Sequence, residues 1–265
     1  MNALEGVFLW GAVGLYVLAL LGALVSAIFH KPWAATVAAG AWSLALVLHL
    51  GAGIVRWIAA GHAPVQYAYE NSLSGSFFVA LVFSVLTLRF PVTRPGLPVV
   101  AAFVLLLLGN GLMAPTTAVP LEPPFRSAWL AVHVLFAWVA FGSYLVASAT
   151  SGVYLFKGRA GRPVSGLLDD LSGRLLALGF AADTVMIASG AIWAHGLWGR
   201  YWGWDPIETW SLLSWLVYGA NLHLRFTLGW QGRRAAWLAV ASVLTVIVTF
   251  FGVGVVSGVH TELLR

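Results

Sequence analysis

Residues 7–29 read VFLWGAVGLYVLALLGALVSAIF, a run without a single charged side chain. An α-helix rises about 1.5 Å per residue, so a run of this length spans the roughly 30 Å hydrocarbon core of a bilayer. No basic segment precedes the run and no small-residue cleavage site follows it. We therefore interpret it as a retained transmembrane helix and not as a cleaved signal peptide.

The composition extends this interpretation to the whole chain. Its 265 residues are 60% hydrophobic and only 9% charged, a balance outside that of soluble globular domains. Apolar runs of spanning length indicate about eight transmembrane helices, near residues 7–29, 33–59, 73–90, 97–114, 127–156, 174–195, 209–226 and 235–258. We predict an all-α fold, a polytopic membrane helix bundle in which residues 1–265 form a single integral membrane domain.

The basic residues are distributed unequally between the two sides of the predicted bundle. Alternate loops and adjoining helix ends carry ten of the fourteen Lys and Arg residues: Lys31, Arg89, Arg94, Lys157, Arg159, Arg162, Arg174, Arg225, Arg233 and Arg234. The positive-inside rule assigns this side to the cytoplasm, so both termini are expected outside. The formal charge of +5 is explained by topology, and we expect a lipid bilayer and no nucleic acid as the surroundings. The preference for Arg over Lys, with abundant Ala and Gly, favours a bacterial cytoplasmic (inner) membrane.

Residues 193–215, which we call the Trp-rich segment, read WAHGLWGRYWGWDPIETWSLLSW and contain six of the fourteen tryptophans. An interfacial aromatic belt accounts for one or two Trp at a helix end, but not for Gly alternating with Trp in a loop. We interpret the segment, on the predicted outer face, as an aromatic platform for a flat ligand of porphyrin size. Asp205 and Glu208 have a structural alternative, because Asp205-Pro206-Ile207-Glu208 matches the capping box of a helix start.

The histidines are the candidate metal ligands, since the chain contains no cysteine. His133, near the outer end of the fifth predicted helix, and His260, at the outer end of the eighth, can both face the Trp-rich segment. Two neutral imidazoles from different helices can hold a haem iron from opposite faces, and this is the site we predict. A hydrogen-bonded helix contact for His133 and a solvated position for His260 are the structural alternatives.

The remaining ionisable residues are sorted by depth in the membrane. His223 lies near the cytoplasmic end of the seventh predicted helix, so it can serve only an inner site. His49 lies deep in the second helix, where a hydroxyl or a backbone carbonyl would satisfy it as well as a metal would. Loop or rim positions are expected for His30, His62 and His195. Asp183 lies in mid-helix, and the sequence gives it no partner.

The WWD signature of haem-handling proteins in cytochrome c biogenesis resembles the run Trp198-Gly-Arg-Tyr-Trp-Gly-Trp-Asp-Pro-Ile-Glu-Thr-Trp210. Three further stretches are most similar to the CcsA (ResC) branch: GHAPVQYAYENS at 61–72, LVYGANLHLR at 216–225 and SGVH at 257–260. The resemblance covers most of the chain, and eight predicted helices fit CcsA better than the smaller CcmC proteins.

The resemblance implies haem handling and attachment in cytochrome c maturation by the system II pathway. A CcsA-type protein works with a CcsB (ResB)-like membrane partner, exports haem b, and holds it at the external WWD site. It presents the haem to the CxxCH segment of apocytochrome c for thioether attachment, as the component of a cytochrome c synthase of the haem lyase type. The thiols belong to apocytochrome c, kept reduced by a thioredoxin-like partner, so proximity is the expected source of catalysis.

The resemblance also implies roles for particular residues. His133 and His260 match the two external haem-iron ligands, and His223 matches an inner ligand whose counterpart comes from the partner. The implied haem-binding residues of the Trp-rich segment are Trp198, Tyr201, Trp202, Trp204, Asp205, Glu208 and Trp210. The sequence departs from the family at Ile207, where Lys is common, and over residues 252–257, which lack the usual Asn and Leu.

Three other functions remain open at this point. A haem transporter or chaperone would hold haem without modifying apocytochrome c. A membrane redox cytochrome would ligate a permanent haem through His49 and His223, which leaves the Trp-rich segment unexplained. A structural membrane subunit would use its tryptophans only as an interfacial anchor.

Overall fold

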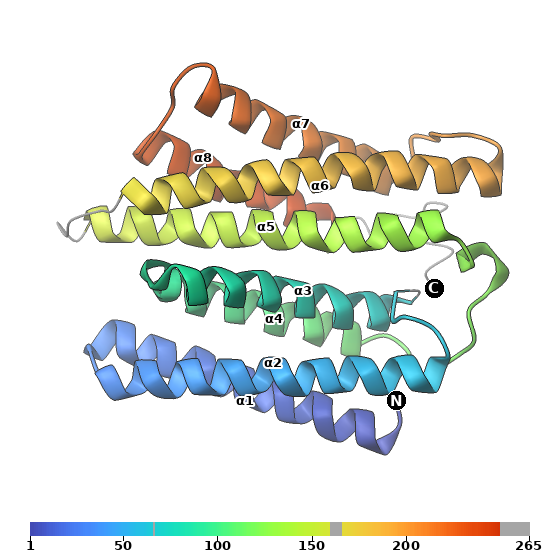
Figure 1. Cartoon of the computed structure of the whole chain (residues 1–265), viewed down its shortest axis with the longest axis horizontal. Helices are drawn as coiled ribbons and strands as arrows, with labels where there is room; N and C mark the ends of the chain where they lie inside the picture. The colour runs from blue at the N-terminus through green and yellow to red at the C-terminus, as the bar shows by residue number, and fades with distance from the viewer. Residues whose placement is uncertain (66, 160–165, 250–265) are drawn as a thin grey trace. The chain divides into compact units, whose positions relative to one another are not determined.

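The computed structural model describes residues 1–65, 67–159 and 166–249, and over these ranges the chain is helical with connecting loops. The α-helices of the described ranges, labelled in Figure 1, are α1 (Ala3–Phe29), α2 (Pro32–Ala60), α3 (Ala68–Arg89), α4 (Leu97–Leu112), α5 (Ala128–Arg159), α6 (Gly166–Trp198), α7 (Pro206–Phe226) and α8 (Arg233–Ile247). Two 3-10 helices, η1 (Pro91–Gly96) and η2 (Pro123–Phe125), complete the regular structure. The all-α prediction is confirmed, because no strand occurs in the described ranges.

Six helical segments are long and apolar enough to cross a bilayer: α1, α2, α3, η1 with α4 (Pro91–Leu112), α5 and α6. This confirms a polytopic membrane helix bundle. The described part of α8 has only 15 residues. Helix α7 has 21 residues but a more polar composition, with Glu208 in its first turn and His223 and Arg225 in its last. Its buried residues are Ser211, Ser214, Tyr218 and Asn221.

The chain folds into two compact units, Met1–Pro123 (unit 1) and Pro124–Arg265 (unit 2). In unit 1, α1 packs along α2, α3 pairs with α4, and α4 also contacts α1. Small side chains let α1 and α2 approach closely, as is common between membrane helices. The fully buried alanines of these two helices are Ala12, Ala19, Ala34, Ala45 and Ala52.

A buried ion cluster ties one end of unit 1 together. The Arg56 side chain is fully buried, and its Nε donates to Glu70 Oε1 at 2.9 Å. Its Nη1 lies 3.9 Å from Glu5 Oε1 and donates to the Thr116 carbonyl oxygen at 2.7 Å. The Tyr69 hydroxyl donates to Glu5 at 2.6 Å. The loop after α4 is thereby fastened to α1, α2 and α3.

In unit 2, α5 and α6 form the main antiparallel pair, α7 packs on α6 and α8, and α8 contacts α5. Figure 1 shows the α6–α7 loop at one end of this unit and the α7–α8 loop at the other. Gly179 allows the Tyr144 ring to lie against the backbone of α6, because a Cβ at position 179 would be 2.5 Å from the ring.

Helix α6 begins earlier than the sequence predicts, at Gly166 and not near residue 174. Its first turns bury Leu168 and place Asp169 where the Arg225 guanidinium donates to both of its carboxylate oxygens at 3.0 Å. An apolar run detects only the part of a helix that lies in lipid, so it misses this polar extension.

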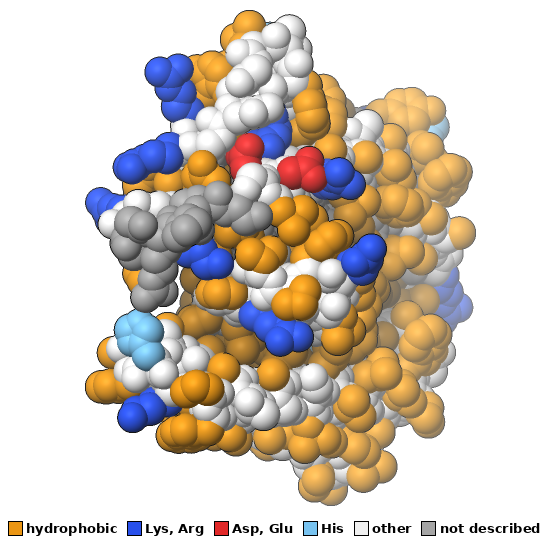
Figure 2. All heavy atoms as spheres, turned by 60° about the vertical axis from the view of Figure 1, so that its left-hand side comes forward, with side chains coloured by type: hydrophobic (Ala, Val, Ile, Leu, Met, Phe, Trp, Pro, Cys, Tyr) orange, Lys and Arg blue, Asp and Glu red, His pale blue; other side chains and the backbone are white. Residues whose placement is uncertain are grey.

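Basic side chains gather at one end within each unit. Figure 2 shows Lys and Arg side chains in blue on a largely hydrophobic surface. In unit 1 this end carries Lys31 after α1, Arg89 at the end of α3 and Arg94 in η1. In unit 2 the corresponding ends carry Lys157, Arg159, Arg174, Arg225, Arg233 and Arg234. The charge asymmetry is thus a property of each unit, and the assignment of this end to the cytoplasm stays a prediction.

Candidate functional site

A small cavity lies at the end of unit 2 opposite its basic end, where α5, α6, the Trp-rich segment and α7 meet. Its volume is about 40 Å³, and it is lined by His133, Met186, Ile187, Gly190, Ala191, Trp193, Tyr201, Trp202, Ile207, Glu208 and Ser211. The structure therefore brings four of the predicted site residues together: His133, Tyr201, Trp202 and Glu208.

His133 is held in one orientation and one tautomer. Its Nδ1 lies 2.8 Å from the carbonyl oxygen of Met186 on α6. A carbonyl oxygen only accepts, so Nδ1 carries the hydrogen and the lone pair of the neutral ring is on Nε2. Gly190 leaves the space for the ring, because a Cβ there would be 2.5 Å from Nδ1. Metal-ligating histidines are typically fixed in this way through their other nitrogen.

The start of the Trp-rich segment is anchored in the fold of unit 2. Trp193 is buried, and its indole Nε1 donates to the Pro124 carbonyl oxygen at 3.0 Å. Trp198, the last residue of α6, packs edge-on against Trp193 with ring centroids 5.5 Å apart. Gly199 then reverses the chain with φ 67°, a conformation that glycine adopts without a steric penalty. Trp198 therefore contacts Trp193, which lines the cavity, but does not line the cavity itself.

Aromatic rings farther along the segment remain open to the surroundings. Tyr201 is 58% exposed and stacks on His195 at 4.2 Å, while Trp204 is 70% exposed. Trp204 also has φ 58°, which is unfavourable for a bulky side chain and is a kind of strain that concentrates at functional sites. The indole Nε1 of Trp202 is buried without an acceptor among the described residues, so it can donate to a ligand in the cavity.

Asp205 and Glu208 form the predicted capping box at the start of α7. The Asp205 carboxylate accepts from the Ile207 amide at 3.0 Å. Glu208 Oε2 accepts from the amides of Asp205 at 3.1 Å and Gly203 at 2.8 Å. The two carboxylates are therefore committed to shaping the loop, and nothing in their geometry indicates acid–base catalysis.

Three predicted site residues lie away from the cavity. Trp210 is half-buried on α7, outside the cavity lining. His223 is exposed near the basic end of the same helix, away from the cavity. His260 lies outside the described residues. Within the described ranges, no three His, Asp or Glu side chains cluster as a metal site.

The His49 side chain is used within unit 1. It is buried, its Nε2 lies 2.9 Å from the Leu73 carbonyl oxygen, and its Nδ1 lies 3.3 Å from the Tyr16 hydroxyl. With Nε2 donating and Nδ1 accepting, the ring has no lone pair left for iron. This geometry counts against the redox-cytochrome alternative, which needs His49 as a ligand.

Sequence reasoning missed Met186, Gly190 and the partner of Asp183. Gly190 has a weak signal, since it interrupts the apolar pattern of α6 one turn before Trp193. The acceptor of His133 is a backbone carbonyl, which leaves no trace in the side-chain pattern. Asp183 accepts a hydrogen bond from the Tyr144 hydroxyl at 3.1 Å, across two helices.

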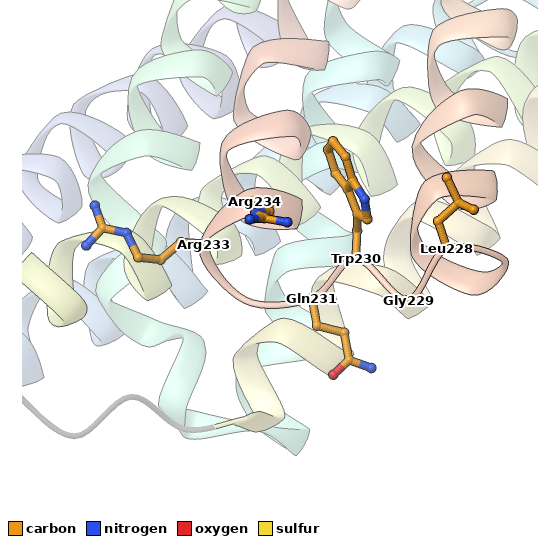
Figure 3. A pocket seen from close by; sticks show the side chains of 6 residues that line it. All are labelled: Leu228, Gly229, Trp230, Gln231, Arg233 and Arg234. Atoms are coloured by element: carbon orange, nitrogen blue, oxygen red, sulfur yellow. The ribbon is translucent and has the colours of Figure 1, made fainter.

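A larger cavity, about 480 Å³, lies elsewhere, in the α7–α8 loop at the basic end. It is lined by Leu228, Gly229, Trp230, Gln231, Arg233 and Arg234. Figure 3 shows these side chains pointing in different directions and not converging on one point. Without an imidazole or a convergent set of polar groups, this cavity does not compete with the one at His133 as a haem site.

Fold and site together define a multi-pass helical membrane protein with an aromatic, histidine-containing pocket at one end of its second unit. The family described as Cytochrome C assembly protein matches residues 9–260. The CcsA protein of Synechococcus sp. (strain RCC307) is 34% identical over 78% of each chain. That of Synechocystis sp. is 30% identical over 89% of this chain and 91% of its own. The chain belongs to the CcsA family and takes part in cytochrome c maturation.

A solved structure confirms the fold at greater evolutionary distance. The chain named Cytochrome c Heme Lyase CcmF superposes with a TM-score of 0.72 at 20% identity, over 95% of this chain. The present chain spans 47% of that CcmF chain, so the likeness concerns the helical architecture alone.

Proposed function

We propose that this chain binds haem b at the His133 cavity and, with a CcsB-like membrane partner, presents it on the outer face to apocytochrome c. The observation that carries the proposal is the oriented His133 ring in the same cavity as the Trp-rich segment. Cytochrome c maturation requires a site of this kind, where haem is held while its edge stays open to a protein substrate.

The residues present fit haem. The Nε2 lone pair of His133 supplies an axial ligand, and the Trp202 N–H, which has no acceptor among the described residues, suits a negatively charged or carbonyl acceptor on the ligand. Haem exceeds a cavity of about 40 Å³, so it must rest against the exposed Tyr201 and Trp204 rings, or the loop must shift. We propose His260 as the second axial ligand.

The chemistry requires positioning more than catalytic side chains. Each thiol of CxxCH adds across a haem vinyl group, with sulfur bonding to one carbon and the thiol hydrogen moving to the other, so the addition needs no oxidant. This chain has no cysteine, and Asp205 and Glu208 already bind backbone amides. Its contribution is to bring the vinyl groups and thiols together, which can supply a large part of the barrier reduction.

The His223 side chain has a separate proposed role. At the basic end of α7 it can ligate haem on the cytoplasmic side, with the second ligand supplied by the CcsB-like partner. An exposed position suits a ligand whose iron site is completed by another protein. Haem would enter here and move to the His133 cavity.

The test uses the chain purified in mild detergent with its CcsB-like partner. We expect a low-spin bis-His haem spectrum in the wild type, its loss in His133→Gly and His260→Gly, and its recovery with added imidazole. His30→Gly is the matched control, since His30 is exposed in the other unit at φ 54°, where glycine is tolerated. A spectrum unchanged in both His133→Gly and His260→Gly would overturn the proposed site.

A haem transporter without synthase activity would pass that spectral test. Incubation of the haem-loaded complex with reduced apocytochrome c separates the two functions. Covalent haem on the CxxCH segment, lost in His133→Gly, supports the synthase, whereas haem transfer without thioether bonds supports the transporter.

A further inference from the structure

Helix α7 turns a polar stripe into the interior of unit 2. Its buried residues are Ser211, Ser214, Tyr218 and Asn221, and their spacing of three or four residues places them on one helical face. Large apolar side chains on the same helix, such as Leu213 and Leu216, are exposed instead. In a membrane protein, polar side chains that face the interior either form hydrogen bonds between helices or line a site for water, ions or protons.

Asp183 of α6 is the ionisable residue at the centre of this interior. Its side chain is fully buried, and one carboxylate oxygen accepts from the Tyr144 hydroxyl at 3.1 Å. The Tyr144 ring is stacked on the Tyr218 ring, with centroids 3.4 Å apart and planes 2° from parallel. The three residues therefore connect α5, α6 and α7 in one polar cluster.

Three buried polar atoms around this cluster have no hydrogen-bond partner among the described residues: Asp183 Oδ1, the Tyr218 hydroxyl and Ser214 Oγ. Ser214 precedes Tyr218 by one helical turn on the buried face of α7. Buried polar groups in native proteins are nearly always paired, and ordered water is the usual partner where protein groups are lacking. Three such atoms match the number of hydrogen bonds that a buried water molecule typically makes, which is two to four.

The charged groups around Asp183 indicate whether its side chain is an ionised carboxylate or a neutral carboxylic acid. Tyr144 from α5 and Tyr218 from α7 are the titratable groups that face it, and in the described part of α8 the ionisable side chains are Arg233 and Arg234, at its start. No cation forms an ion pair with Asp183 within the described ranges. A carboxylate without a cation is strongly unfavourable in a membrane interior, whereas a neutral carboxylic acid is tolerated.

We propose that Asp183, Tyr144, Tyr218 and Ser214 form an intramembrane site that binds water and holds an exchangeable proton on Asp183. Polar residues continue from it in both directions along α7. Ser211 lines the His133 cavity, and the Asn221 side chain donates to Ser242 Oγ on α8 at 2.7 Å. The site is defined by these contacts alone and does not depend on haem.

Infrared spectroscopy of the full chain in lipid nanodiscs tests both parts of the proposal. We expect the C=O stretching band of a protonated carboxylic acid, its loss in Asp183→Asn, and its shift to lower frequency after transfer to D₂O. Asp170→Asn is the matched control, because Asp170 lies on the same helix but is 51% exposed and paired with Arg174. A missing band in the wild type, or a band that does not shift in D₂O, would overturn the proposal.

A second measurement needs no variant at Asp183. Hydroxyl-radical footprinting oxidises buried side chains only where water is bound nearby, so Tyr144 and Tyr218 should be modified faster than Tyr16. Tyr16 is equally buried, and its hydroxyl already has His49 as its partner. Equal rates at all three tyrosines would contradict bound water.

A further variant, Tyr218→Phe, keeps the ring and removes the hydroxyl. It should shift the infrared C=O band of Asp183 without removing it.

Discussion

His133 keeps its orientation because residue 190 has no side chain. The imidazole donates to the Met186 carbonyl oxygen, and its ring occupies the space that a Cβ on Gly190 would fill. Glycine within a helix costs roughly 1 kcal/mol relative to alanine, so its presence needs a local reason. Here the reason is a ring position that sets the direction of the Nε2 lone pair.

Gly190→Ala should therefore reduce haem binding without weakening α6. The new methyl group would displace the His133 ring from the Met186 carbonyl, whereas alanine favours the helix by roughly 1 kcal/mol. Gly196→Ala, at a position where a Cβ meets nothing within 4 Å, is the control and should bind haem normally. Haem content and thermal unfolding of both variants give the answer. Equal haem content in the two would show that residue 190 does not set the ring position.

The first turn of α7 depends on Glu208. One carboxylate oxygen accepts from two backbone amides, at Gly203 and Asp205, so this residue shapes the loop as well as the helix start. Amides at a helix start have no partner within the helix, and side chains that accept from them are the usual solution. Glu208 thus fixes the backbone on both sides of Trp204.

Glu208→Ala should loosen this loop locally. Loss of a capping interaction typically costs about 0.5–2 kcal/mol, and hydrogen exchange at residues 203–208 should accelerate accordingly. Asp170→Ala removes an exposed carboxylate from α6 and should change exchange by little, since exposed ion pairs contribute about 0–1 kcal/mol. Unchanged exchange at residues 203–208 in Glu208→Ala would mean that other contacts hold the loop.

At the scale of helices, apolar runs predict the bounds well where lipid exposure decides the sequence, and poorly where side chains pair across helices. Helix α2 is expected at 33–59 and spans Pro32–Ala60. Helix α3 is expected from residue 73 but begins at Ala68, because the buried Glu70 in its first turn pairs with Arg56. A short stretch of sequence around Glu70 does not show that Arg56 will be its partner.

The same limit applies to the candidate site. Local patterns predict the Trp-rich segment and His133, and four adjacent residues predict the capping box. The Met186 carbonyl lies 53 residues from His133 and the Tyr144 hydroxyl lies 39 residues from Asp183, so both contacts depend on helix packing. One sequence without its fold cannot place them.

At the scale of whole units, the stability of unit 1 depends on its buried carboxylates keeping their cation. Arg56→Met would leave Glu5 and Glu70 buried without their cation, and breaking a buried pair typically costs about 3–5 kcal/mol. We expect a markedly lower melting temperature in detergent. Arg89→Met, which removes a guanidinium near the Phe90 ring, should cost at most about 1 kcal/mol. Similar melting temperatures for the two variants would show that the ion cluster does not hold the unit together.

The charge asymmetry makes a prediction about the whole molecule in its membrane. Positive residues at one end of each unit place that end in the cytoplasm, so the His133 cavity should face outward. The chain has no cysteine, so single cysteines report their location without background. Arg200→Cys in the exposed α6–α7 loop should react with a membrane-impermeant maleimide in intact cells. Gln231→Cys in the α7–α8 loop should react only after permeabilisation. The opposite pattern would place the His133 cavity on the cytoplasmic side, where the proposed presentation of haem to an external apocytochrome c could not occur.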